Sequence, residues 1–130
     1  MAFPEPDTDL PLFDRAYLEN LFGDGDGVPP EMVQELYSLF EPENAAKLAD
    51  IRPRAEAGDA DAVMGGAHFI AGSAANLGLS RLSTLARAHE VAIEEGATDR
   101  LPERVAAIQA VFDETRSAFR QAFRPDESTG

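Results

Sequence analysis

The chain has 130 residues, enough for one domain with one hydrophobic core. It contains no cysteine, which excludes disulfides, thiolate catalysis and cysteine-ligated zinc, and fits the reducing cytoplasm. Acidic residues number 24 against 11 basic ones, and the net charge of −13 disfavours nucleic acid and anionic membranes as partners. No apolar run approaches the roughly 18 residues of a membrane-spanning helix. These properties predict a cytoplasmic protein that binds other proteins.

The N-terminal part of the chain is expected to contribute little to the core. Residues 1–12 are acidic and proline-rich, unlike a signal peptide, and predict a flexible arm. The apolar spacing in Phe13–Phe22 predicts a short amphipathic helix. The loop after it contains Asp24-Gly25-Asp26-Gly27, but the further oxygen ligands and closing glutamate of an EF-hand are missing. No metal site is therefore expected.

Four longer helices follow, each with apolar residues three or four positions apart. Pro30 suits the first position of a helix, Gly58 suits a helix end, and Asp59 suits the N-cap of the next helix. Pro42 and Pro53 each remove a backbone hydrogen bond and predict a kink or a frayed stretch. The predicted helices span residues 30–57, 60–77, 80–96 and 102–123.

The helix over residues 60–77 has the most regular apolar stripe, with steps of three and four residues that are typical of the seam of an antiparallel bundle. The connections between the helices are short, so neighbouring helices should run antiparallel. We therefore predict an all-α fold, an up-and-down antiparallel four-helix bundle with an additional short N-terminal helix. This domain covers residues 13–123, residues 124–130 form a disordered tail, and the complete core predicts a monomer. The stripe consists of Ala60, Val63, Ala67, Ile70, Ala74 and Leu77.

The two histidines occupy different positions relative to these stripes. His89 falls on the apolar face of its helix, which favours a buried histidine with a structural role. His68 lies one residue, about 100°, off the seam, which places it at the shoulder of the helix and open to water. His68 is therefore the candidate reactive residue.

Glycines surround His68 in the interior of its helix, where each should cost about 1 kcal/mol relative to alanine. Gly72 lies four residues after His68, directly beside the ring on the same face. A side chain there would stand between the imidazole and an approaching protein surface. Gly65 and Gly66 lie on other sides of the helix, where close helix packing is an alternative explanation.

The segment His68-Phe-Ile-Ala-Gly72-Ser73-Ala-Ala-Asn76-Leu77-Gly78 resembles the motif His-x-x-Lys-Gly-Ser-x-x-x-Leu-Gly of histidine-containing phosphotransfer (HPt) domains. The likeness extends from about Leu18 to Phe123. The resemblance implies a phosphorelay intermediate: His68 accepts a phosphoryl group from a receiver aspartate or a sensor histidine kinase and passes it to a response-regulator receiver. It implies no cofactor in this chain, because the receiver supplies the acidic pocket and Mg²⁺.

The resemblance also assigns roles to residues around His68. Gly72 and Ser73 match the family, and with Gly65 and Phe69 they are expected to form the partner-binding surface. Glu90 falls where the family often has a polar residue that orients the imidazole, although a solvated surface glutamate remains the alternative.

Ala71 is the departure from the family. It stands at the partner-facing position where the motif has a lysine that offers a cation to the phosphoryl group, and Lys47 and Arg81 are the candidate substitutes.

Other functions remain as alternatives. The missing lysine is consistent with a regulatory module that docks receivers with weak or no phosphotransfer. The phosphoacceptor region of a histidine kinase would use His89-Glu90, but His89 lies on the core stripe and the proline expected after that pair is missing. Two histidines on different faces do not form a clustered set of metal ligands.

Overall fold

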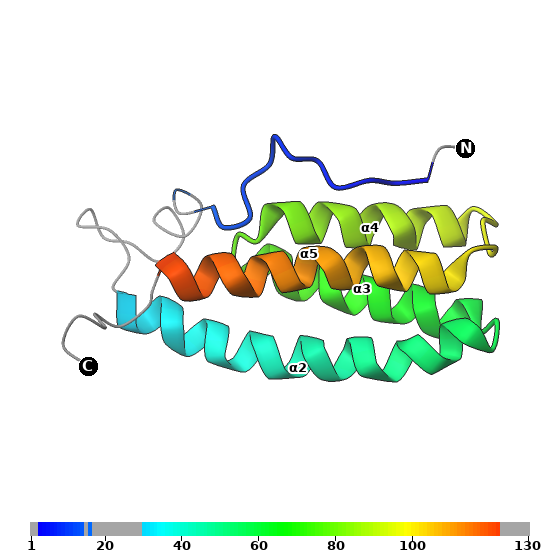
Figure 1. The fold of residues 1–130 in the computed structure, drawn as a ribbon, viewed down its shortest axis with the longest axis horizontal. Coiled ribbons are helices and arrows are strands. Elements are labelled where there is room, and N and C mark those ends of the chain that lie inside the picture. Colours follow the sequence, from blue (N-terminus) through cyan, green and yellow to red (C-terminus); the bar gives the residue numbers. More distant parts are fainter. Residues whose placement is uncertain (1–2, 15, 17–29, 123–130) are drawn as a thin grey trace.

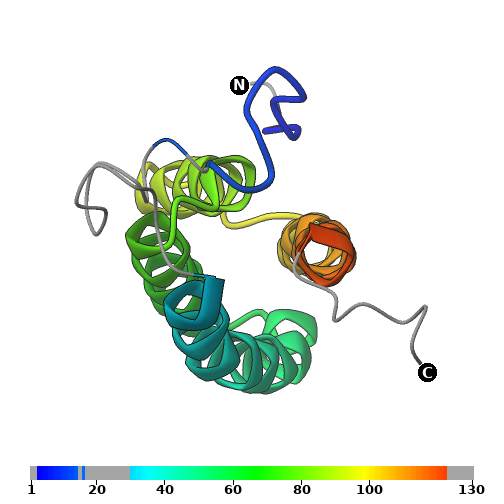
Figure 2. The same ribbon diagram turned by 90° about the vertical axis from the view of Figure 1, so that its left-hand side faces the viewer.

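The computed structural model describes residues 3–14, 16 and 30–122. Within them the fold is all-α, as predicted, and contains no strand. Successive helices run in opposite directions along the long axis (Figure 1), and an end-on view shows them arranged around a common centre (Figure 2). None of the described helices is long and apolar enough to cross a bilayer. The helices are α2 (Pro30–Glu56), α3 (Ala60–Asn76), α4 (Ser80–Glu94) and α5 (Leu101–Ala122).

Helix boundaries follow the local signals in the sequence. The Asp59 side chain accepts a hydrogen bond of 3.1 Å from the Ala62 amide and caps the start of α3. Gly58 and Gly78 end α2 and α3 with φ angles of 78° and 70°, a conformation that glycine adopts without strain. Helix α2 continues through its two internal prolines instead of ending at either. Apart from residues 13, 14 and 16, the predicted N-terminal helix and the tail over 124–130 lie outside the described residues.

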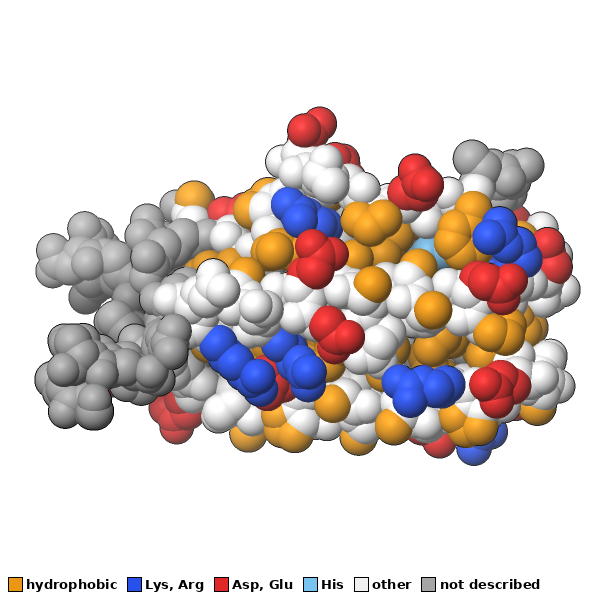
Figure 3. All heavy atoms as spheres, in the orientation of Figure 1, with side chains coloured by type: hydrophobic (Ala, Val, Ile, Leu, Met, Phe, Trp, Pro, Cys, Tyr) orange, Lys and Arg blue, Asp and Glu red, His pale blue; other side chains and the backbone are white. Residues whose placement is uncertain are grey.

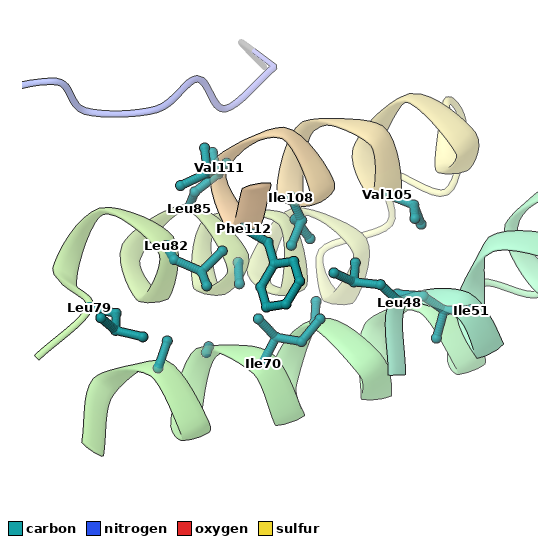
Figure 4. Packing of buried hydrophobic residues seen from close by; sticks show 14 of the residues in the cluster. Leu48, Ile51, Ile70, Leu79, Leu82, Leu85, Val105, Ile108, Val111 and Phe112 are labelled. Carbon is teal, nitrogen blue, oxygen red and sulfur yellow. The ribbon is translucent and has the colours of Figure 1, made fainter. Parts of the chain in front are cut away.

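The core contains one face of each of the four helices. The predicted stripe on α3 is buried from Val63 to Leu77, and Ala60 packs against its edge. Figure 4 shows the ring of Phe112, on α5, pointing toward Ile70 on α3. Asn44, fully buried on α2, donates hydrogen bonds to the Phe40 carbonyl (2.8 Å) and the Ser73 hydroxyl (3.0 Å). These contacts fix the rotation of α3 and therefore the direction in which His68 points.

Gly66 allows α3 to pack closely on α2. A Cβ atom added at Gly66 would lie 2.6 Å from Cγ2 of Ile51, a buried side chain that has little room to move. At Gly65 the same atom would meet nothing within 4 Å. Gly66 is therefore explained by helix packing, and Gly65 is not.

These two glycines give a matched stability test. We expect Gly66→Ala to lower the free energy of unfolding by about 1–3 kcal/mol, because the new methyl group overpacks the α2–α3 contact. Gly65→Ala should raise it by up to ~1 kcal/mol through helix propensity. Urea denaturation of both variants measures the difference, and equal effects at the two positions would contradict this packing.

The N-terminal segment, part of the flexible arm predicted for residues 1–12, lies along the bundle where it is described (Figure 1). The Arg81 side chain donates hydrogen bonds to the carbonyls of Leu10 (2.9 Å) and Thr8 (3.2 Å). Its backbone amide donates to the Pro11 carbonyl (3.0 Å). The ring of Phe3 lies edge-on to that of His89, with 4.9 Å between their centroids. Contacts through backbone carbonyls leave no residue pattern in a sequence, so the arm's binding was not predicted.

The face that carries the arm and α5 has a mixed surface. Acidic and basic side chains are interspersed over it, with hydrophobic groups between them (Figure 3). The negative charge of the chain is therefore not gathered into one patch on this side.

Candidate functional site

His68 projects from α3 toward α4, where it meets Glu90. Its Nδ1 atom lies 2.7 Å from Oε2 of Glu90. The His68 side chain is 66% exposed, whereas that of Glu90 is 11% exposed. The His68 ring is thus open to a partner, while its Nδ1 contacts the mostly buried carboxylate of Glu90. The sequence predicted the exposed shoulder position of His68, and the structure places Glu90 beside it.

The contact with Glu90 defines the tautomer of His68. A carboxylate only accepts hydrogen bonds, so the proton of the neutral imidazole lies on Nδ1. Nε2 then carries the free lone pair. Among the described residues no side chain holds Nε2. The arrangement presents an oriented nitrogen nucleophile at the surface, and Glu90 is placed to stabilise the positive charge that the ring gains when Nε2 forms a bond.

Arg87 joins this pair from the same helix as Glu90. Its Nη1 lies 3.7 Å from Oε1 of Glu90, an ion pair longer than a hydrogen bond. That carboxylate oxygen is buried and has no hydrogen-bond partner among the described residues. Arg87 was not among the residues predicted from the sequence: its spacing of three residues from Glu90 indicates a pair on one helix, but not that the pair lies beside His68.

His89 is the opposite case. It is fully buried, and its Nδ1 accepts a hydrogen bond of 3.1 Å from Nη1 of Arg104, as a neutral imidazole can. Burial lowers the pKa of His89 from 6.5 to about 4; the charge of Arg104 adds to this, and the backbone of Pro4 opposes it. His89 is therefore a neutral core residue, as its place on the apolar stripe predicted, and is not open to a partner.

The open side of His68 is poor in side chains. Gly65 was expected on another side of the helix, but it lies three residues before His68 and so shares its face. Gly65 and Gly72 are both exposed, and a Cβ atom at either would meet nothing within 4 Å. Phe69 is a large hydrophobic side chain exposed on the same helix, and Nζ of Lys47 lies 5.0 Å from the centre of its ring. Gly65, Phe69 and Gly72, all on α3, are therefore available to a protein that approaches His68.

Two residues expected at the partner-binding surface lie elsewhere. Ala71 is only 7% exposed and belongs to the hydrophobic core, because the close packing of α3 covers its methyl group. Ser73 faces α2, where it accepts the hydrogen bond from the buried Asn44. Both residues therefore pack inside the bundle, which differs from the partner-binding surface expected for them.

The candidate substitutes for the motif lysine also have other contacts. Arg81 holds the N-terminal arm, and Lys47 lies over the Phe69 ring. The described structure thus gives neither residue a contact with His68.

Comparison with protein families gives a match to the Hpt domain over residues 35–118. The matched region contains His68, Glu90 and most of the four described helices. No curated protein and no solved structure matched the chain.

Proposed function

The chain belongs to the Hpt domain family, and we propose that His68 is its phosphoryl-carrying residue. Hpt domains have a histidine phosphotransfer role in two-component signalling and interact there with receiver domains and kinases. In our proposal this chain acts as a cytoplasmic monomer that receives the group from a receiver aspartate or a kinase and passes it to a response-regulator receiver. The Mg²⁺ needed for transfer belongs to the receiver.

One observation carries the proposal: an exposed imidazole whose Nδ1 is held at 2.7 Å by a mostly buried carboxylate. The Nε2 lone pair of His68 forms the N–P bond as the bond from phosphorus to the donor's aspartate oxygen breaks. The bonding electrons leave with the donor carboxylate. Nδ1 keeps its proton, so the ring becomes cationic, and the charge of Glu90 stabilises it. Transfer to the next receiver is the reverse reaction.

The docking surface in this proposal is the open face of α3 around His68. Gly65 and Gly72 let a receiver approach the ring without meeting a side chain, and Phe69 offers apolar contact area. A receiver has to bring its aspartate into line with Nε2, which requires close approach of two protein surfaces.

Gly72→Gln tests this docking surface. We expect receiver binding to weaken by about ten-fold or more, because the new side chain fills the open space beside His68. The free energy of unfolding should not fall, since that space holds no other atoms. Ser117→Gln, at an exposed position on α5, is the control and should leave binding unchanged. Calorimetric titration with a receiver domain measures both, and unchanged binding of the Gly72 variant would place the docking surface elsewhere.

Relay is distinguished from regulation by following the phosphoryl group. A receiver labelled with radioactive acetyl phosphate is mixed with the protein, which is then separated and offered to a second, unlabelled receiver. We expect acid-labile, alkali-stable label to appear on this chain and to move on to the second receiver. Binding without label would instead support the receiver-docking regulatory module, the alternative that the alanine at position 71 favours.

A further inference from the structure

Phosphorylation of His68 creates a charge problem at this site. The incoming phosphoryl group carries close to two negative charges and is bound to a ring that already contacts the carboxylate of Glu90. The imidazolium between them contributes only one positive charge, so the phosphoryl group, the ring and Glu90 together carry about two net negative charges, and a further cation beside them would relieve the repulsion. A cation within reach of the phosphoryl oxygens is therefore expected to favour the phosphorylated state.

Arg87 is placed to be that cation. It already pairs with the Glu90 oxygen that does not hold His68, and its side chain is 64% exposed, so the guanidinium is free to move. The long contact of 3.7 Å leaves the Arg87 donors incompletely used by Glu90.

Helices α3 and α4 run antiparallel (Figure 1), so Arg87, three residues before Glu90, lies level with the part of α3 that follows His68. His68 and Glu90 lie at the same level of the two helices. Arg87 lies about one turn before Glu90 on α4, and Gly72 lies about one turn after His68 on α3. Because the two helices run in opposite directions, Arg87 and Gly72 lie at similar levels. Gly72 has no side chain, and the space beside it is empty. Nothing described there blocks the guanidinium from reaching a group on Nε2.

We propose that Arg87 binds the phosphoryl group on His68 and thereby supplies from α4 the cation that α3 lacks. This inference rests on the proposed function of His68. Arg87 makes and breaks no covalent bond and transfers no proton. Its guanidinium turns from Oε1 of Glu90 to donate N–H hydrogen bonds to phosphoryl oxygens, a geometry that arginine provides well. Oε2 of Glu90 stays on Nδ1 throughout.

The test uses Arg87→Gln with Arg120→Gln as a matched control. Arg120 lies on α5, is 65% exposed and pairs at 3.1 Å with Glu41, a glutamate that is 23% exposed, so it matches Arg87 in its exposure and in having a carboxylate partner. We expect label uptake from one phosphorylated receiver to slow by about two- to five-fold in Arg87→Gln. Arg87→Lys should recover part of the rate, and Arg120→Gln should match the wild type.

A second readout separates phosphoryl binding from receiver docking. The ³¹P spectrum of the phosphorylated protein, isolated from the receiver, is recorded as a function of pH. Loss of Arg87 should raise the pKa of the phosphoryl group, because a cation favours its dianion. Lys47→Gln should leave this titration unchanged. An unchanged titration in Arg87→Gln, or a shift in Lys47→Gln in its place, would overturn the role of Arg87 while leaving His68 as the carrier. Absence of any label on the wild type would overturn both proposals.

Discussion

His68→Gln is expected to take up no label from a phosphorylated receiver. The substitution removes the only exposed imidazole of the described residues, and glutamine offers no nucleophilic nitrogen. Its amide can still donate a hydrogen bond to Glu90, so the carboxylate is not left without a partner. The free energy of unfolding should therefore stay within about 0.5 kcal/mol of the wild type. Label counting and urea denaturation on the same preparation measure the two effects.

His89→Gln serves as the control for this experiment. His89 is buried and bonded to Arg104, so its replacement should lower stability while sparing label uptake at neutral pH. Label retained by the His68 variant and lost by the His89 variant would show that the two histidines have been assigned the wrong roles.

Stability should fall in acid because of His89. Its folded-state pKa of about 4 lies below the ordinary value of 6.5, so the unfolded chain takes up a proton more readily. The stability contributed by the neutral imidazole is fully present above pH 6.5 and is lost as the pH falls toward 4. The loss amounts to about 3 kcal/mol at most, since one pKa unit corresponds to ~1.4 kcal/mol.

Urea denaturation at pH 7 and pH 4.5 measures this effect against His89→Gln. Carboxylates titrate in both proteins, so the difference between them isolates the histidine. We expect the stability advantage of the wild type at pH 7 to shrink or reverse at pH 4.5. A constant difference at the two pH values would mean that His89 is not held neutral by its surroundings.

The sequence predicted those parts of the fold that depend on local pattern. The spacing of apolar residues along α3 predicted its buried face, and Asp59 predicted where the helix begins. The offset of His68 from the seam predicted an exposed ring. The all-α class and the approximate limits of the four described helices follow from the same periodicity.

Features that depend on how helices face each other were not predictable in this way. Gly65 and Gly66 are adjacent glycines, yet only Gly66 packs against another helix. The rotation of α3 relative to α2 determines which of the two faces α2. The same rotation buries Ala71, which its match to the motif lysine had placed on the partner side. Arg87 was not predicted because its proposed role depends on the contact between Glu90 on α4 and His68 on α3.

The central claim, that Nε2 of His68 accepts the phosphoryl group while Glu90 holds Nδ1, has one direct measurement. Protein with ¹⁵N-labelled histidine is phosphorylated by a receiver, and long-range ¹H–¹⁵N spectra are compared before and after. The account predicts phosphorus on Nε2 of His68, a proton retained on Nδ1, and unchanged signals from His89. Phosphorus on Nδ1 of His68, or on either nitrogen of His89, would contradict it.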